Sequence, residues 1–490
     1  MFEDKIIIDK VNDVWIKVNA PDGIRQEMAD FFTFTVPGAS FMPSVRNKFW
    51  DGKIRLYNQL TRQMYFGLHP YINSFAEERD YEVEYGPGFD SDEFSLFEAK
   101  QFIKKLELPY EPRDYQIDAF AHCIKNKRAL MVSPTASGKS LIIHMICQHF
   151  NRMFDNKRTL IVVPTTSLVH QMYTDFQEYG CPDNWMHRIM EGFEKDSDAM
   201  IQISTWQSIH KLPKTWFKKF DVVIGDEAHL FKAKSLTSVM TKLENTEYRF
   251  GFTGTLDGTQ THKLVLEGLF GEVNQVTTTS ELIEEGTLAD FNVKGIVLKY
   301  PDEDRIVVSK YKYQDELDFL VANPQRNRFI KNLIYSLNGN TLLLYQYVEK
   351  HGKVIFDLLE KEKNLINEKP IFFVHGGVEA EEREKIRGIV ENEKDAVIVA
   401  SYGTFSTGIN IRNLDNVVFA SPSKSKIRVL QSIGRGLRRS ETKSKATLLD
   451  IADDLQWKSK KNYTLEHFAE RIKMYNEEKF DYKIYKVNLK

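Results

Sequence analysis

Cysteine is scarce in this chain and follows no pattern. The three cysteines, Cys123, Cys147 and Cys181, stand alone, without Cys-x-x-Cys spacing. The sequence therefore excludes a cysteine-ligated zinc site and a disulfide framework, and a reducing compartment suits it. Long apolar runs are missing too, since none approaches the roughly 18 residues that span a bilayer. Because the chain also opens on acidic residues rather than a basic leader, we expect a cytoplasmic protein without membrane contact.

A surplus of charge of one sign is also absent. The 67 basic and 69 acidic residues give a formal net charge of -2 at pH 7. This balance excludes a uniformly basic nucleic-acid binder, so any affinity for a phosphate backbone must come from local patches. Apolar residues make up 42% of the chain, which is enough to fill the cores of about three domains at this length.

Short apolar runs recur in two series, each typical of buried parallel strands. The first series is residues 129–132, 160–163, 201–204, 222–224 and 250–253. The second is residues 342–345, 371–374, 396–400, 417–420 and 447–449. Because amphipathic stretches such as residues 141–150 and 167–179 separate the runs, we predict an α/β fold with two tandem doubly wound parallel-sheet domains.

Residues 1–100 lack this rhythm and are predicted to form a small α+β domain. The expected parallel-sheet domains then span residues 101–290 and 291–455, and residues 456–490 are expected to form a terminal helix packed on the second. Residues 71–99 hold nine acids and a single base. This imbalance predicts a solvated acidic linker.

A patch at residues 41–62 combines basic side chains with aromatic rings. The basic side chains suit contacts with a phosphate backbone, as a duplex or a junction arm would offer. Phe49 and Trp50 would stack on exposed bases, although packing in a core explains these two aromatic residues equally well. The predicted DNA contacts are Arg46, Lys48, Lys53 and Arg55.

Two strands are followed by strings that predict an ATP site. The run at 129–132 leads into a loop ending in Gly138-Lys139-Ser140, and the run at 222–224 leads into Asp226-Glu227-Ala228-His229. A loop of this kind lets backbone N–H groups and a helix N-terminus cradle phosphates. Gly-Lys-Ser alone is a common string, but the far rarer acidic string makes the pair specific. The expected nucleotide contacts are Thr135, Ser137, Gly138, Lys139 and Ser140.

Each of these residue types has a chemical role. Lys139 is expected to bind the β- and γ-phosphates, Ser140 to bind Mg²⁺, and Asp226 to hold the ion through water. Glu227 would deprotonate the attacking water, while His229 is better placed to relay than to catalyse. A helix N-cap pair is the alternative explanation of the two carboxylates, and the upstream loop makes it the minor one.

Positive charge for the transition state is expected from the second domain. The run from Gln431 to Arg438 places Arg435 and Arg438 three residues apart on one helical face. We predict that both are arginine fingers with Gln431 beside them; a basic surface helix is the alternative. A site shared by two domains would convert ATP hydrolysis into relative domain motion.

The order of these motifs over residues 110–455 resembles that of the superfamily 2 DExH helicases. The resemblance implies RecA-like domains, adenine recognition by Gln116, and a nucleotide contact at Gly408. It implies coupling of hydrolysis to strand separation at His229, Thr253 and Thr255. One departure is in the phosphate loop, where Ser133 and Ala136 stand at positions at which glycine or alanine and then glycine are commoner in the family. The nucleic-acid contacts that the resemblance implies are Pro164, Thr165, Thr205, Gln207 and Thr404. Taken individually, each of these residues could equally well be a small polar cap of a helix.

Over its whole length, the chain is similar to the recombination helicases of T-even bacteriophages. This likeness implies a monomer in the host-cell cytoplasm that acts on branched, single-stranded and duplex DNA and on RNA–DNA hybrids. Two alternatives stay open: a duplex translocase that does not separate strands, and a nucleotide-gated protein that anneals or protects strands. Glu227, Arg435 and Arg438 argue against the second, since a binding module needs neither a water-activating base nor arginine fingers.

Overall fold

The computed structural model describes residues 5–154, 157–256, 258–366, 369–404, 411, 413–421 and 445–489. The chain divides into two units, one formed by residues 1–133 and 137–277 and the other by residues 134–136 and 278–490. Each unit has one seven-stranded parallel sheet, which confirms the predicted fold class. Within the described ranges, no helix has the length and apolarity that crossing a membrane requires.

The parallel sheet of the first unit has the order β10-β11-β9-β12-β13-β8-β14. Its strands are β8 (Arg128–Val132), β9 (Thr159–Val163), β10 (Met186–Ile189), β11 (Ile201–Thr205), β12 (Val222–Asp226), β13 (Tyr248–Thr253) and β14 (Val273–Gln275). The principal helices are α4 (Leu96–Lys104), α5 (Asp114–Asn126), α6 (Lys139–Met153), α7 (Thr166–Glu178), α10 (Lys234–Lys242) and α11 (Gln260–Phe270). The five predicted runs match β8, β9, β11, β12 and β13, because strands covered on both faces are apolar almost throughout.

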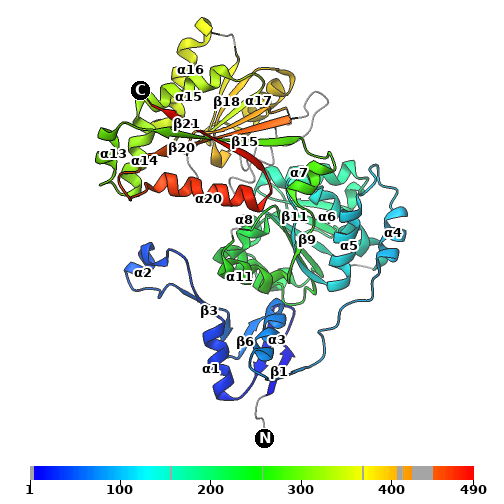
Figure 1. Cartoon of the computed structure of the whole chain (residues 1–490). Helices are drawn as coiled ribbons and strands as arrows, with labels where there is room; N and C mark the ends of the chain where they lie inside the picture. The colour runs from blue at the N-terminus through cyan, green and yellow to red at the C-terminus, as the bar shows by residue number, and fades with distance from the viewer. Residues whose placement is uncertain are drawn as a thin grey trace. The chain divides into compact units, whose positions relative to one another are not determined.

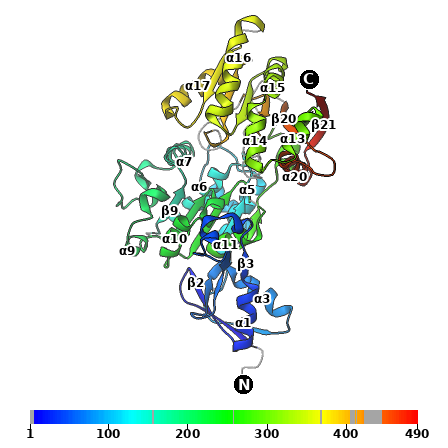
Figure 2. The ribbon, with the colours of Figure 1, turned by 90° about the vertical axis from the view of Figure 1, so that its left-hand side faces the viewer.

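A separate five-stranded sheet, ordered β5-β6-β2-β1-β7, precedes it. Its strands are β1 (Lys5–Lys10), β2 (Trp15–Asn19), β5 (Tyr57–Asn58), β6 (Gln63–Tyr65) and β7 (Glu82–Tyr85). Helices α1 (Asp22–Phe31) and α3 (His69–Glu77) lie side by side (Figure 2), with the rings of Phe31 and Phe75 5.2 Å apart. The prediction of an acidic linker at 71–99 is wrong over residues 71–85, since α3 buries Ile72, Phe75 and Ala76 and β7 pairs with β1; residues 86–95, between β7 and α4, contain no helix or strand.

An arm extends from this N-terminal domain. Its stalk is the two-stranded sheet of β3 (Thr33–Thr35) and β4 (Lys53–Arg55), and its tip holds η1 (Ala39–Phe41) and α2 (Pro43–Arg46). Figure 1 shows α2 standing away from the sheet that contains β1 and β6. The arm carries the predicted aromatic-basic patch.

The N-terminal domain packs closely against α11 of the first unit. A Cβ added to Gly67, in η2 (Phe66–Leu68), would lie 2.0 Å from the carbonyl oxygen of Glu267. The Tyr71 hydroxyl donates to the Glu267 carboxylate at 2.6 Å. Because only glycine permits this backbone approach, Gly67 allows the two domains to dock.

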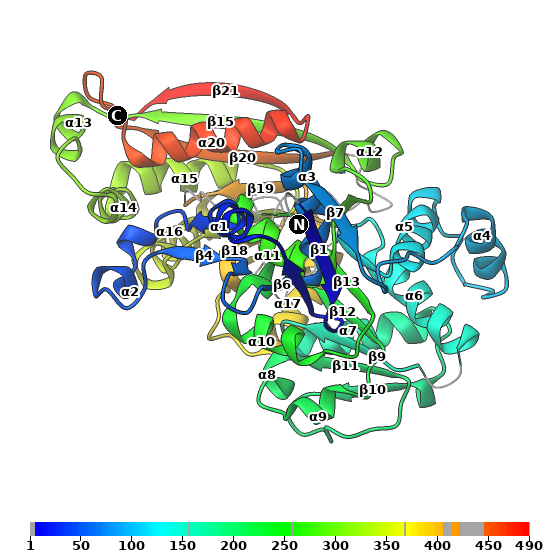
Figure 3. The ribbon, with the colours of Figure 1, turned by 90° about the horizontal axis from the view of Figure 1, so that it is seen from below.

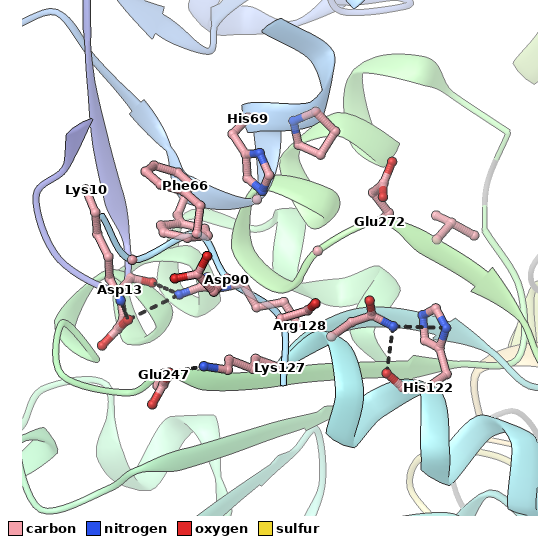
Figure 4. A pocket seen from close by; sticks show the side chains of 18 residues that line it. Lys10, Asp13, Phe66, His69, Asp90, His122, Lys127, Arg128, Glu247 and Glu272 are labelled. Carbon is pink, nitrogen blue, oxygen red and sulfur yellow. Dashed lines mark hydrogen bonds and ion pairs between the residues drawn. The ribbon is translucent and has the colours of Figure 1, made fainter. Parts of the chain in front are cut away.

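A cavity of about 460 Å³ lies at this junction (Figure 4). Arg128 forms part of its wall, with the guanidinium 4.1 Å from the centre of the Phe66 ring and Nη2 donating to the Asp13 carbonyl oxygen at 2.6 Å. Burial lowers the pKa of Arg128 to about 10, against the opposing effect of Asp13. None of the predicted site residues lines this cavity.

The parallel sheet of the second unit has the order β17-β18-β16-β19-β20-β15-β21. Its strands are β15 (Asp290–Lys299), β16 (Thr341–Tyr345), β17 (Ile371–Val374), β18 (Val397–Ser401), β19 (Asn416–Phe419), β20 (Lys445–Asp454) and β21 (Asp481–Asn488). The helices include α13 (Asp302–Val308), α14 (Tyr313–Ala322), α15 (Pro324–Ser336), α16 (Lys353–Ile366), α17 (Ala380–Asn392) and α20 (Tyr463–Glu477). Figure 3 shows α20 lying along β20 and β15. The sequence analysis did not predict β21, which pairs with β15 at the edge of the sheet.

Candidate ATP site and nucleic-acid interface

The phosphate loop joins β8 to α6. Gly138 is the N-cap of α6 and has φ +77, a conformation that favours glycine. A Cβ at this position would also lie 2.1 Å from Nε2 of Gln116. Inside the loop, the hydroxyls of Ser133 and Ser137 are 2.6 Å apart. The string Gly-Lys-Ser thus begins the helix that follows a buried strand and the loop, as phosphate binding requires.

Gln116, in the first turn of α5, is hydrogen-bonded to this loop. Its Nε2 donates to the Ser137 carbonyl oxygen at 2.7 Å, and its Oε1 accepts from the Arg113 backbone N–H at 2.9 Å. A primary amide has two hydrogens and two carbonyl lone pairs. One of each remains for a base, so the geometry is compatible with adenine recognition, which stays a prediction.

Lys139 and the two carboxylates meet at the carboxyl end of β12. Nζ of Lys139 lies 2.6 Å from Oδ1 of Asp226 and 3.5 Å from Oε1 of Glu227. Burial alone lowers the pKa of Lys139, but the two carboxylates outweigh this effect and the pKa rises. Burial raises the pKa of Asp226; the Lys139 ammonium opposes that rise and Glu227 adds to it. The lysine is therefore held charged where phosphates would enter.

Glu227 follows β12 in a left-handed conformation, with φ +52. His229, in η4 (Ala228–Lys232), has Nδ1 3.4 Å from Oε2 of Glu227 and 2.9 Å from Oγ1 of Thr253. The Thr253 hydroxyl donates its one hydrogen to the carbonyl oxygen of Thr255 at 3.0 Å. It must therefore accept from His229, which assigns the proton to Nδ1. The three predicted coupling residues form one connected chain.

Hard oxygen donors at this site fit magnesium. Ser140 offers a hydroxyl on the first turn of α6, and Asp226 offers a carboxylate that is 4% exposed. No group of three or more His, Cys, Asp or Glu suited to a metal occurs among the described residues. Because Mg²⁺ usually takes one or two protein ligands together with phosphates and water, Ser140 and Asp226 would suffice to hold it.

Ala136 has φ +69, so it occupies the left-handed region, which favours glycine. A side chain there costs about 1 kcal/mol. We expect Ala136→Gly to raise the free energy of unfolding by up to about 1 kcal/mol, measured by urea denaturation. Ala121→Gly, inside α5, is the control and should lower it by a similar amount. Equal destabilisation by both would refute strain at Ala136.

The predicted nucleic-acid contacts differ in accessibility. Thr165 is the N-cap of α7, and the exposed Gln207 of α8 (Trp206–Ile209) donates to the Pro164 carbonyl oxygen at 3.3 Å, which joins α8 to the segment after β9. Thr205 and Thr404 are only 5% and 6% exposed. Their hydroxyls lie 2.9 Å from Ser208 and 2.8 Å from Ser401. Side-chain contacts with a nucleic-acid strand are thus more accessible at Thr165 and Gln207 than at Thr205 and Thr404.

The arm presents the predicted patch to solvent. Phe49 is 85% exposed and Phe41 74% exposed, so core packing does not explain them. Trp50 is half-buried and donates from Nε1 to the Lys53 carbonyl oxygen at 2.9 Å. Arg55 forms an ion pair with Asp51. Within the described part of the chain, the charges of Arg46, Lys48 and Lys53 have no carboxylate within 4.0 Å.

Four predicted residues lie outside the described ranges, namely Gly408, Gln431, Arg435 and Arg438. The sequence analysis in turn missed Tyr179, whose hydroxyl is 3.0 Å from that of Ser140. No local string signals this contact, because 39 positions separate the two residues.

Three family descriptions match successive parts of the chain. They are "DNA helicase UvsW, N-terminal" over residues 8–85, "Type III restriction enzyme, res subunit" over 109–258, and "Helicase conserved C-terminal domain" over 325–440. The ATP-dependent DNA helicase uvsW of Enterobacteria phage T4 is 36% identical, over 97% of this chain and 98% of its own. The DNA 3'-5' translocase XPB2 of Sulfurisphaera tokodaii is 24% identical, over 86% and 95%. The crystal structure of T4 UvsW matches with a TM-score of 0.52 and 34% identity, over 99% of this chain and 100% of that one.

Proposed function

This chain belongs to the UvsW family of ATP-dependent superfamily 2 DNA helicases, and from that premise we propose that it acts as a monomer on branched DNA and RNA–DNA hybrids. Forks, Holliday junctions and R-loops are the proposed substrates, in replication, recombination and repair. The observation that supports a branched substrate is the exposed arm, which sets Phe41 and Phe49 among basic side chains. Bases at a branch point lose a stacking neighbour, and an aromatic ring can replace it.

The residues at the end of β12 support a hydrolytic mechanism. Lys139 would leave its carboxylate partners to bind the β- and γ-phosphates, and Glu227, released from the lysine, would accept a proton from the attacking water. A magnesium ion held by Ser140 and Asp226 would supply positive charge to the phosphates. His229 connects Glu227 with Thr253, so a change at the base reaches the loop after β13. The fingers Arg435 and Arg438 and the nucleotide contact at Gly408 stay predictions.

ATP hydrolysis by the wild type and by Lys139→Ala tests this function. Hydrolysis is measured without nucleic acid and with a single strand, a duplex, a four-way junction and an RNA–DNA hybrid, and strand separation is followed in parallel. We expect the junction to stimulate hydrolysis and strand exchange in the wild type and neither in the variant. Hydrolysis with triplex displacement but no strand separation would identify a duplex translocase. No turnover that depends on Lys139 would leave a strand-binding protein.

Charge reversal on the arm tests the proposed DNA contact. We expect the triple variant Lys48→Glu, Lys53→Glu, Arg55→Glu to bind a junction at least about 10-fold more weakly than the wild type. The slope of log affinity against log salt concentration should fall by the equivalent of two to three phosphate contacts. Basal ATP hydrolysis should persist, because the arm is separate from the phosphate loop. The control reverses the charges of Lys100 and Lys104 on α4 and of Lys105 at its C-cap, which makes the same change of charge elsewhere in the first unit. Equal losses of junction binding in the two triple variants would show that the arm contributes only through its net charge.

A further inference from the structure

Helix α7 spans the first unit between two proposed sites. Thr165, a proposed nucleic-acid contact, caps its N-terminus and accepts from the Leu168 backbone N–H at 3.4 Å. Tyr179 is the C-cap of the same helix. Thirteen residues separate these caps, so the helix is about 20 Å long. One rigid element therefore connects the two ends.

Tyr179 reaches the phosphate-binding helix. Its hydroxyl lies 3.0 Å from Oγ of Ser140. Its ring packs edge-on against His144 of α6, with centroids 5.4 Å apart, and His144 in turn contacts Phe176 of α7. The Tyr179 ring is thus packed against α6, and it also lies edge-on to Tyr110 with centroids 6.2 Å apart, while its hydroxyl contacts the residue proposed to bind magnesium.

The contact with Tyr179 affects how the Ser140 hydroxyl is oriented towards a cation. A serine hydroxyl has one hydrogen and two lone pairs. When Ser140 donates its hydrogen to Tyr179, both lone pairs remain available to a cation. When Tyr179 moves away, the hydroxyl is free to rotate and to turn its hydrogen towards the cation instead.

We propose that Tyr179 is a positioning residue that orients the Ser140 hydroxyl, and that α7 couples this contact to nucleic acid held at Thr165. The inference rests on the proposed function, because it needs both ligands. Val169, Met172 and Phe176 are buried along one face of α7, so packing along its length holds the helix as one unit. A phosphate at its N-terminus is favoured by the helix dipole and would fix the position of Tyr179.

Coupling of this kind is reciprocal. Single-stranded DNA should tighten the binding of a fluorescent non-hydrolysable ATP analogue to the wild type by about 10-fold in the presence of Mg²⁺. We expect Tyr179→Phe, which removes only the hydroxyl, to reduce that enhancement to less than about 2-fold and to raise the half-saturating Mg²⁺ concentration at least about 5-fold. Binding of the analogue in EDTA should not change.

Tyr173→Phe is the matched control on the same helix. The Tyr173 ring lies 4.5 Å from the Arg188 guanidinium, and no hydrogen bond to its hydroxyl occurs among the described residues. This variant should retain the full enhancement. In a Ser140→Ala background, Tyr179→Phe should have no further effect, since the contact is already lost; an additive effect would overturn the proposal.

The failures of the two proposals are distinguishable. A wild type whose hydrolysis does not respond to any nucleic acid contradicts the proposed function. A wild type that responds, together with a Tyr179→Phe variant that shows the same enhancement and Mg²⁺ requirement, overturns only the role of Tyr179.

Discussion

Glu227→Gln should reduce the rate of ATP hydrolysis by about 10²- to 10⁴-fold while nucleotide binding remains. Glutamine keeps the shape of the side chain but has no basic carboxylate to accept a proton. Asp226 and Lys139, which would hold magnesium and phosphates, are unchanged. Because Glu227 is already in a left-handed conformation, glutamine, whose side chain has the same shape, adds little backbone strain.

The measurement is single-turnover hydrolysis together with equilibrium binding of the ATP analogue. Glu194→Gln, at an exposed position of the same unit, is the control and should match the wild type in both. A loss of binding equal to the loss of rate would assign Glu227 to nucleotide binding rather than proton transfer. A rate within a factor of a few of the wild type would exclude it as the base.

Asp453→Ala should destabilise the second unit by about 3–5 kcal/mol. Arg326 and Asp453 are both fully buried, and Nε and Nη2 of the arginine donate to the carboxylate at 2.8 and 3.0 Å. The Tyr300 hydroxyl also donates to Asp453, at 2.8 Å. Truncating the carboxylate leaves these donors, and a cation, buried without their acceptor. The Arg326 guanidinium then keeps the bond from Nη2 to the Ala420 carbonyl oxygen at 2.8 Å and the contact of Nη1 with Nε2 of His351 at 3.5 Å, and neither partner is an anion.

Hydrogen exchange of peptides from β16 and β20 measures this loss, because a protein with two units need not unfold in one step. Replacing both partners, as Arg326→Met with Asp453→Leu, should recover much of the stability. The exposed pair of Lys385 and Glu381 on α17 is the control, since Glu381→Ala should cost about 0.5 kcal/mol or less. A small effect of Asp453→Ala would show that the buried pair is not an anchor of the sheet.

The parallel strands were predictable because burial on both faces leaves an apolar run in the sequence. All five residues of β9 and of β16 are buried, and their runs stood out. β21 was not predictable by that signal, since it is an edge strand with mostly exposed residues, including Lys483 and Lys486. At an edge, hydrogen bonds to a single neighbour hold the strand, and they leave no pattern of side chains.

Charge misled where periodicity was the better guide. The acids of residues 71–99 indicated a linker, yet Ile72, Phe75 and Ala76 have the three- and four-residue spacing of a helical face and are buried on α3. Of the acids of residues 71–99, only Glu77 lies within α3, where it is exposed and costs little because it remains in water. Over residues 71–85 the surplus of acid therefore reflected exposed side chains on and beside α3 and β7, not an absence of structure.

The sequence by itself was enough to predict the ATP site, because a phosphate loop and the carboxylates after a strand are contiguous strings whose function depends on local backbone. Tertiary structure decided which distant residues support that chemistry. Ser140 and Tyr179 are 39 positions apart, and Arg326 and Asp453 are 127 apart. It also decided that Phe49 faces solvent, a choice that composition left open. Contacts across such separations follow from how helices pack on sheets, and packing depends on the whole chain rather than on any segment.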